Sequence, residues 1–118
     1  MACKSPRARR MRYLMGCFVE VEALGGEPKE AFDAVEAAFG EMKRIERTLS
    51  KYLPDSMVSQ INRLATMKPV EVSSEVFRFL EKCLRFSRLT DGAFDMTVTP
   101  YVDLWESACE RGALPAPD

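Results

Sequence analysis

Residues 18–54 read FVEVEALGGEPKEAFDAVEAAFGEMKRIERTLSKYLP, and they contain the signals of a strand, a turn and a long helix in succession. In residues 19–23 apolar side chains alternate with glutamate, which is the period of a half-buried strand. Gly25-Gly26 then breaks the strand, because paired glycines favour a turn. Pro28 follows, and the first residue of a helix tolerates proline.

A long amphipathic helix is predicted from Pro28 onward. Its apolar side chains recur at steps of three and four residues, whereas most charged side chains lie off that stripe. Pro54 ends the region, since proline forbids an ordinary helical continuation and restricts the residue before it. The apolar stripe consists of Phe32, Val35, Phe39, Met42, Ile45 and Leu49.

Shorter elements are predicted between the long helix and residue 72. Asp55 or Ser56 can cap a short helix that runs to about Leu64, because short polar side chains accept from the first backbone amides of a helix. Residues 69–72, Pro-Val-Glu-Val, predict a short strand with proline at its start, where a missing backbone donor is least harmful.

A second long amphipathic helix is predicted after residue 72. Ser73 or Ser74 caps it, and Asp91-Gly92 closes it as a glycine stop. Residues 100–105 open another short helix, and residues 111–118 have the composition of a loop. The inner stripe of the second long helix consists of Val76, Phe77, Leu80, Cys83, Leu84 and Ser87.

This order of elements predicts an α+β fold, with two long amphipathic helices packed on a small, incomplete β-sheet. Two strands are too few for a stable sheet with both edges open. We therefore expect further strands from additional sequence or from a second copy of the chain, which would make a homodimer.

The composition fits one globular domain and narrows the chemistry. The chain has 118 residues, 47% of them hydrophobic, with four Cys and no His. Without imidazole, neither a Ser-His-Asp triad nor a His-ligated zinc site can form. The cysteines form no C-x-x-C pair, so unpaired thiols in a reducing compartment are expected.

The charge is distributed unevenly. Residues 1–12 carry five basic and no acidic side chains, so the rest of the chain has a net charge of −6 within the total of −1. An acidic body is a poor platform for nucleic acid, because phosphate binding needs a basic face. We expect residues 1–12 to be a disordered basic arm.

An export signal is not expected. Leu14-Met15-Gly16-Cys17 is similar to a lipoprotein cleavage box, but only three residues separate Arg12 from Gly16. A signal peptide needs about 7 to 15 apolar residues at that place. The sequence therefore predicts a cytoplasmic chain without a transmembrane segment.

Two polar stretches are unusual for linkers. Residues 49–62 combine a tyrosine, serines and an asparagine around one predicted helix-to-helix turn, and residues 89–100 are rich in hydroxyl groups. Small polar groups on loops between rigid helices often line small-molecule sites. Turns need the same residue types for capping, so a purely structural explanation also stands.

Together these stretches resemble the ApbE family, the FAD:protein FMN transferases. The similarity runs from about residue 12 to 106, and its linked motifs occur in the family's order. The resemblance implies an ApbE-like, T-fold-like fragment, with residues 13–107 as the N-terminal part of the domain and 108–118 as a loop at which it is truncated. The matching pieces are Met15-Gly16, Ile45–Tyr52, Ser56-x-x-Ser59-x-x-Asn62, Thr90–Val98, Pro100 and Leu104-Trp105.

What the resemblance implies is a flavin phosphotransferase. Members bind FAD with Mg²⁺, and a Thr or Ser hydroxyl of a target flavoprotein attacks the FMN-side phosphorus, so that AMP leaves. Members are often exported or anchored to a membrane. The alternative is a non-catalytic module that binds flavin or a partner protein.

The family pattern implies a set of FAD contacts in this sequence. The set consists of Met15, Tyr52, Asn62, Ala93, Phe94 and Asp95. A flexible thioether and an aromatic ring suit a large flat ring system. An asparagine can donate and accept hydrogen bonds, and a carboxylate can accept them from the nucleotide.

Most of these residues also have a structural explanation. Met15 could fill a strand core, Tyr52 could close the long helix, and Asn62 could cap a turn. Asp95 could be an acid of a surface turn, and Phe94 is better explained as a core anchor.

The sequence departs from the family in two ways. Met15-Gly16-Cys17 replaces the family's Met-Gly-Thr, and a thiol is a weaker hydrogen-bonding group than a hydroxyl. Family members are also longer, and their Mg²⁺ ligands and their histidine lie in the part beyond. No catalytic or metal-binding residue is therefore assigned to this chain.

Overall fold

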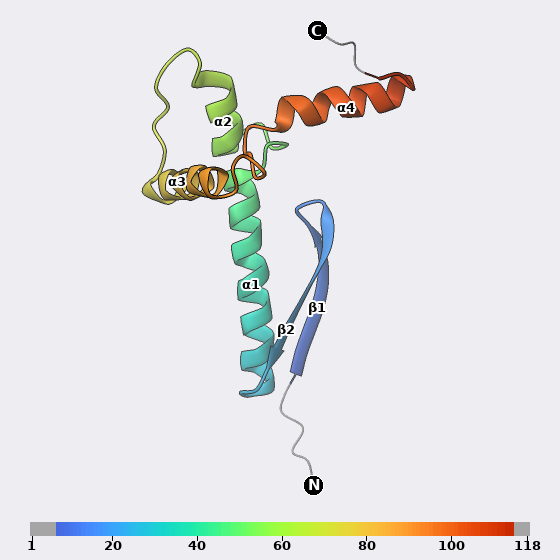
Figure 1. Cartoon of the computed structure of the whole chain (residues 1–118). Coiled ribbons are helices and arrows are strands. Elements are labelled where there is room, and N and C mark those ends of the chain that lie inside the picture. Colours follow the sequence, from blue (N-terminus) through green and yellow to red (C-terminus); the bar gives the residue numbers. More distant parts are fainter. Residues whose placement is uncertain (1–6, 115–118) are drawn as a thin grey trace. The chain divides into compact units, whose positions relative to one another are not determined.

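A computed structural model gives the structure of residues 7–114, which contain two strands and four helices (Figure 1). This confirms a mixed α and β chain, while the T-fold topology stays a prediction. The chain divides after Glu71 into two compact units. The elements are β1 (Arg7–Leu14), β2 (Cys17–Leu24), α1 (Pro28–Leu49), α2 (Met57–Leu64), α3 (Ser74–Leu89) and α4 (Thr99–Arg111).

The first unit begins with an antiparallel hairpin in which Leu14 pairs with Cys17. Its two-residue turn, Met15-Gly16, has φ angles of 53° and 78°. Positive φ at both central residues is the geometry of the tight hairpin turn that matches strand twist. A Cβ on Gly16 would meet no atom within 4 Å, so the backbone conformation and not lack of space favours glycine there.

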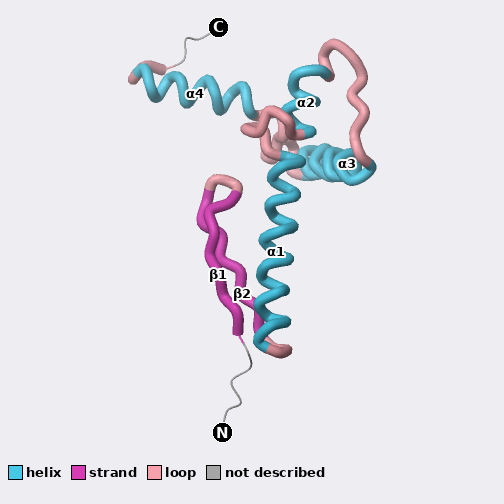
Figure 2. The backbone as a smooth tube through the Cα atoms, turned by 180° about the vertical axis from the view of Figure 1, so that it is seen from behind, coloured by secondary structure: helices cyan, strands magenta, loops and turns pink. Residues whose placement is uncertain are grey.

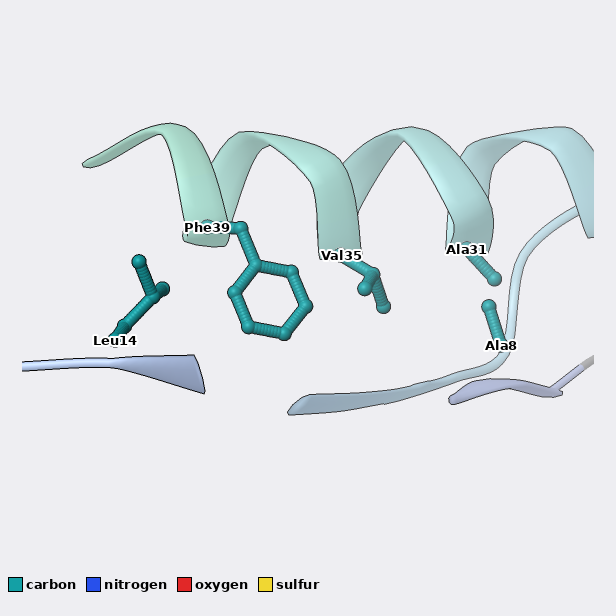
Figure 3. Packing of buried hydrophobic residues seen from close by; sticks show 5 residues of the cluster. All are labelled: Ala8, Leu14, Ala31, Val35 and Phe39. Carbon is teal, nitrogen blue, oxygen red and sulfur yellow. The ribbon is translucent and has the colours of Figure 1, made fainter. Parts of the chain in front are cut away.

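One face of the hairpin packs on α1, which runs alongside it in Figure 2. Ala8 and Leu14 of β1 meet Ala31, Val35 and Phe39 of α1 in a small core (Figure 3). Val35 and Phe39 are fully buried, as the spacing of the apolar stripe predicts. The long helix and its packing on the sheet are confirmed.

Arginine side chains of β1 reach the helix as well. The guanidinium carbon of Arg12 lies 4.6 Å from the centroid of the Phe39 ring. The same guanidinium donates to both carboxylate oxygens of Glu36, at 2.6 and 2.8 Å. The expectation of a disordered arm is therefore wrong for residues 7–12, because they belong to β1, which pairs with β2 and contacts α1. Residues 1–6 lie outside the described residues.

The other face of the hairpin is polar at one end and aromatic at the other. Arg7 pairs with Glu22 and Arg9 pairs with Glu20 across the strands. The rings of Tyr13 and Phe18 meet edge to face, with centroids 5.4 Å apart. On this face the two arginines of β1 are thus paired with two glutamates of β2.

The starts of α1 and α2 agree with the predictions for Pro28 and Ser56. Pro28 is the first residue of α1, and the backbone N–H of Glu27 donates to the Glu30 carboxylate at 3.0 Å. Ser56 caps α2 by accepting from the Ser59 backbone N–H at 3.0 Å. The predicted strand at 69–72 is wrong, because the sheet of the described residues contains only β1 and β2 and offers this segment no hydrogen-bonding partner.

The second unit contains α3 and α4. Ser73 caps α3, and positive φ angles at Asp91 and Gly92 follow its end, as predicted. The fourth helix is longer than expected: it runs to Arg111 and ends at Gly112, whose φ is 63°. The loop expected over 108–118 is therefore wrong for 108–111, because an αL glycine and not the preceding residues stops the helix.

The packing of α3 on the sheet stays a prediction, since α3 lies in the second unit. Residues 115–118 lie outside the described residues. Across the described part of the chain, no helix is both long and apolar enough to cross a membrane.

Candidate functional site

A cleft of about 440 Å³ lies in the first unit, where the hairpin turn meets the carboxyl end of α1 and the loop that follows. This loop consists of residues 50–56, and residues 50–53 of it line the cleft. Two of the predicted FAD contacts, Met15 and Tyr52, therefore lie in one cleft although 37 positions separate them in the sequence. The lining consists of Met15, Gly16, Ile45, Glu46, Leu49, Ser50, Lys51, Tyr52 and Leu53.

Met15 lies at the first position of the hairpin turn, with about half of its surface exposed. Its φ of 53° is a conformation that a residue with a side chain adopts reluctantly. Its backbone N–H donates to Oε1 of Glu46 at 2.8 Å, which ties the turn to α1. The bond to Glu46, a residue distant in the sequence, therefore holds the turn and with it Met15 at the cleft.

Tyr52 lines the cleft from the loop after α1, and the residue is 80% exposed. Its backbone N–H donates to the Ser50 hydroxyl at 3.3 Å. The Lys51 ammonium lies 5.0 Å from the centroid of the ring. Tyr52 is therefore not packed in a core of the described residues, and its assignment to the flavin stays a prediction.

Two buried serines hold the loop that carries Tyr52. The Ser56 hydroxyl donates to the Ser50 carbonyl at 2.6 Å, and the Ser59 hydroxyl donates to the Lys51 carbonyl at 3.1 Å. Both serines are buried, so these bonds satisfy polar groups that water does not reach. The Ser56-x-x-Ser59 spacing thus builds the support of the loop and not the lining of the cleft.

Asn62 is not among the residues that line the cleft. It is exposed on α2, the helix that begins with the serine cap. Its place three residues after Ser59 fits the pattern of the resemblance, but the structure gives it no part in the cleft. Its assignment to the flavin stays a prediction.

The Ala93-Phe94-Asp95 segment lies in the second unit, in the turn between α3 and α4. The Thr90 hydroxyl accepts from the Phe94 backbone N–H at 3.0 Å and donates to the Phe86 carbonyl at 2.9 Å. Phe94 is 43% exposed and is not a buried core anchor as expected. The role of this segment in flavin binding stays a prediction.

Asp95 is held by its neighbour Thr97. One carboxylate oxygen accepts from the Thr97 backbone N–H at 2.8 Å and from the Thr97 hydroxyl at 2.7 Å. These bonds lower the pKa of Asp95, the backbone bond more than the hydroxyl bond. The carboxylate of Asp95 therefore stays ionised to lower pH than that of an ordinary aspartate.

Cys17, where the family has threonine, is exposed and begins β2. Its thiol donates to the Leu14 carbonyl at 3.5 Å, a weak local bond across the turn. It is not among the residues that line the cleft. In this chain the residue therefore closes the hairpin and does not contact the candidate flavin site.

Sequence reasoning did not single out Glu46 and Lys51 as residues of the site. One signal was present: Glu46 lies in the last turn of α1, where a carboxylate is disfavoured by the helix dipole. Among residues 7–114, no three Cys, Asp or Glu side chains gather in a way that could hold a metal ion.

The sequence of the chain is similar to those of known proteins. The sequence model of the ApbE family matches residues 15–118. The FAD:protein FMN transferase of Treponema pallidum (strain Nichols) is 30% identical over 110 residues, which are 92% of this chain and 30% of that protein. Its counterpart in Chlamydia muridarum (strain MoPn / Nigg) is 32% identical over 89 residues, which are 75% of this chain and 27% of that protein.

A third relative, the FAD:protein FMN transferase of Haemophilus influenzae (strain ATCC 51907 / DSM 11121 / KW20 / Rd), is 34% identical over 71 residues. That match covers 59% of this chain and 20% of the relative. The chain thus spans less than a third of the length of these three relatives. The family match covers most of the chain and includes the cleft, so the chain belongs to the ApbE family.

Proposed function

We propose that this chain supplies part of the flavin site of an FAD:protein FMN transferase. Such an enzyme would bind FAD and transfer its FMN part to a Thr or Ser hydroxyl of a target flavoprotein, with release of AMP. Membership of the ApbE family and the names of the relatives support this function. A cytoplasmic location and a homodimer that completes the sheet remain part of the proposal.

The observation that carries the proposal is the meeting of Met15 and Tyr52 in one mainly apolar cleft. A flavin ring system is large, flat and mostly apolar, and binding sites for such ligands combine apolar walls with an aromatic surface. Leu49 and Leu53 contribute further apolar lining beside the tyrosine. The exposed ring of Tyr52 is available to stack on the isoalloxazine.

The strained backbone of Met15 also supports a role in binding. Asparagine or glycine would adopt the observed φ at lower cost, since their short or absent side chains suit the left-handed region. Non-glycine residues in this region persist mainly where the surrounding structure holds them, and they cluster at functional sites. The cost is understandable if the thioether contacts the ligand.

The net charge of the cleft contributes little to the selection of its ligand. Glu46 and Lys51 give the lining one charge of each sign. The Glu46 carboxylate accepts the Met15 N–H, and the Lys51 ammonium lies over the Tyr52 ring. Apolar contact and stacking therefore carry the attraction, while the polar groups fix the shape of the walls.

The proposed reaction is a phosphoryl transfer. The oxygen of the acceptor hydroxyl would form a bond to the FMN-side phosphorus of FAD, the bond from that phosphorus to the bridging oxygen would break, and AMP would leave with that oxygen. The hydroxyl proton would pass to a base or to solvent. Mg²⁺ would neutralise pyrophosphate charge in such a reaction, but the described residues offer it no set of ligands.

A non-catalytic flavin-binding module is the second candidate. It is favoured by one observation: residues 7–114 present a cleft for the ring system but no cluster of groups for a metal ion. FAD titration followed by flavin fluorescence, together with an assay of AMP release, separates the two functions. Binding without AMP in the presence of Mg²⁺ and an acceptor peptide favours the module.

The direct test of the cleft is Tyr52→Ala. We expect it to weaken FAD binding by about 1 to 3 kcal/mol, the range found when a base loses an aromatic partner. Tyr52→Phe is the matched control, because it keeps the ring and removes only the hydroxyl. An FAD dissociation constant that is unchanged in Tyr52→Ala would show that the ring does not contact the flavin.

A further inference from the structure

We propose that Glu46 is a positioning residue that holds the hairpin turn in the shape needed for flavin binding, an inference that rests on the proposed function. Its carboxylate accepts the Met15 backbone N–H at 2.8 Å, across 31 positions of sequence. Glu46 also lines the cleft. It would act through the turn and would not itself contact the reacting atoms.

The helix gives no local reason for a glutamate at this position. Glu46 lies three residues before the last residue of α1, where unpaired carbonyls make a negative side chain unfavourable. The residue is only partly exposed, so solvent compensates its charge incompletely. The hydrogen bond to Met15 offsets these costs, because bonds to charged acceptors are among the strongest in proteins.

The turn needs such a tie more than an ordinary hairpin turn does. Met15 has a φ of 53°, which its side chain disfavours, so the free turn would sample other conformations. For a ligand that binds only one of these conformations, the apparent affinity falls in proportion as the fraction of molecules in that conformation falls. By accepting the N–H of Met15, Glu46 raises the fraction of molecules in which Met15 lies at the cleft.

A second bond between the same elements lies elsewhere and provides a comparison. Glu36 lies ten residues before Glu46 on α1, about 15 Å from it along the helix axis. It accepts from the Arg12 guanidinium. That bond helps to dock the hairpin on α1 but does not involve the turn. Substitution of Glu36 therefore tests the docking of the hairpin on α1, and substitution of Glu46 tests the position of the turn.

The test compares Glu46→Ala with the wild type in the full chain, using two measurements. Exchange of the Met15 amide hydrogen, followed by NMR, reports on the turn without any ligand. We expect it to accelerate about tenfold or more, since a bond to a charged group is lost. Flavin fluorescence gives the FAD dissociation constant, which we expect to rise about threefold or more as the competent turn becomes less populated.

The controls distinguish a positioning role from a merely structural one. Glu46→Gln keeps an oxygen acceptor, so its Met15 exchange rate and its FAD dissociation constant should stay close to those of the wild type. Glu41→Ala removes an exposed glutamate of the same helix that bonds to Arg44, and it should change neither value. Glu36→Ala should lower the melting temperature and leave FAD affinity nearly unchanged. If Glu46→Ala does not fold, Glu46→Asp replaces it, because the shorter side chain keeps the charge and loses the reach.

Each result decides the inference. Unchanged exchange of the Met15 amide in Glu46→Ala overturns it, and so does faster exchange with unchanged FAD affinity. A wild-type chain that binds no FAD overturns the proposed function, whereas the exchange measurement still shows whether Glu46 holds the turn. The positioning role is established if Glu46→Ala shows faster exchange and weaker FAD binding while Glu46→Gln keeps both values close to those of the wild type.

Discussion

The two units of the chain hold their polar side chains in different ways. In residues 7–71, hydrogen bonds of Arg12 and Met15 reach partners 24 and 31 positions away. In residues 72–114, the bonds of Thr90 and Asp95 reach partners only two to four positions away. The cleft therefore depends on tertiary packing, whereas the Ala93–Asp95 turn depends on the chemistry of its own residues.

The two units also bury apolar surface to different degrees. The first unit has a contiguous core of five buried residues between the hairpin and α1. In α3 and α4 the buried apolar residues are Val76, Cys83 and Ala108, while Phe77 and Trp105 are each 55% exposed. Core substitutions should therefore be far more damaging in the first unit, and the following substitutions test this contrast.

Phe39→Ala should have the largest effect. Its ring is fully buried, so truncation should lower the free energy of unfolding by about 3 to 5 kcal/mol. The cation–π contact with Arg12 would be lost as well. Urea unfolding followed by circular dichroism measures the change.

Phe77→Ala, on α3, is the matched control for this core substitution. Its ring is already largely exposed, so the cost should stay below about 1 kcal/mol. Similar losses for the two variants would contradict the idea that the core of the described residues lies in the first unit.

Strong local signals made much of the fold predictable. The period of the apolar stripe predicted helix α1, and Pro28 predicted its start. Ser56 and Ser73 predicted the starts of α2 and α3. These features depend on residues within one or two helical turns, which sequence patterns report directly. The strand β2 was equally clear, because glutamates alternate with apolar residues on it.

The strand β1 was not predictable, because its inward face carries arginines where an apolar pattern was sought. Arg10 and Arg12 lie over the rings of Phe32 and Phe39, so aromatic faces and a glutamate of α1 accept these cations. Such partners come from a distant part of the chain, and no local pattern reveals them. The predicted strand at 69–72 failed for the opposite reason: its local pattern was adequate, but no partner strand lies beside it among residues 7–114.

The candidate site was predictable only in part. The resemblance to the ApbE family pointed to Met15 and Tyr52, and the structure brings them into one cleft. The roles of Glu46 and of the buried serines were not predictable, since each depends on a contact with backbone atoms of another segment. Backbone acceptors and donors leave no signature in the sequence.

Ser56→Ala should have an intermediate effect. It removes both the cap of α2 and the bond to the Ser50 carbonyl, and the serine is almost fully buried. We expect a loss of about 1 to 2 kcal/mol of unfolding free energy. FAD binding should weaken as well, because the loop that carries Tyr52 loses a support.

Ser73→Ala is the matched control for the cap, taken from the second unit. Ser73 caps α3 by accepting from the Val76 N–H at 3.3 Å, and the residue is exposed. Its loss should cost at most about 1 kcal/mol and leave the cleft unchanged. Calorimetric melting and an FAD titration of both variants measure this difference. Weaker FAD binding in Ser73→Ala would contradict this expectation.

Thr97→Ala should have the smallest effect, confined to the titration of Asp95. The lowered pKa comes first from the Thr97 backbone N–H and second from its hydroxyl. The substitution removes only the second bond, so the pKa of Asp95 should rise part of the way toward its ordinary value. NMR of the Asp95 carboxyl carbon, between about pH 2 and pH 6, measures the midpoint.

The sign of the pH effect follows from this lowered pKa. A carboxylate that is held in the folded state stabilises the fold at pH values above its ordinary pKa, and this contribution disappears as the pH falls through the lowered value. The same titration in Phe39→Ala tests the contrast between the units. Because both bonds of Asp95 are local, its pKa should stay lowered when the core of the first unit is disrupted. A return to the ordinary value in Phe39→Ala would mean that the turn, like the cleft, is held by distant contacts.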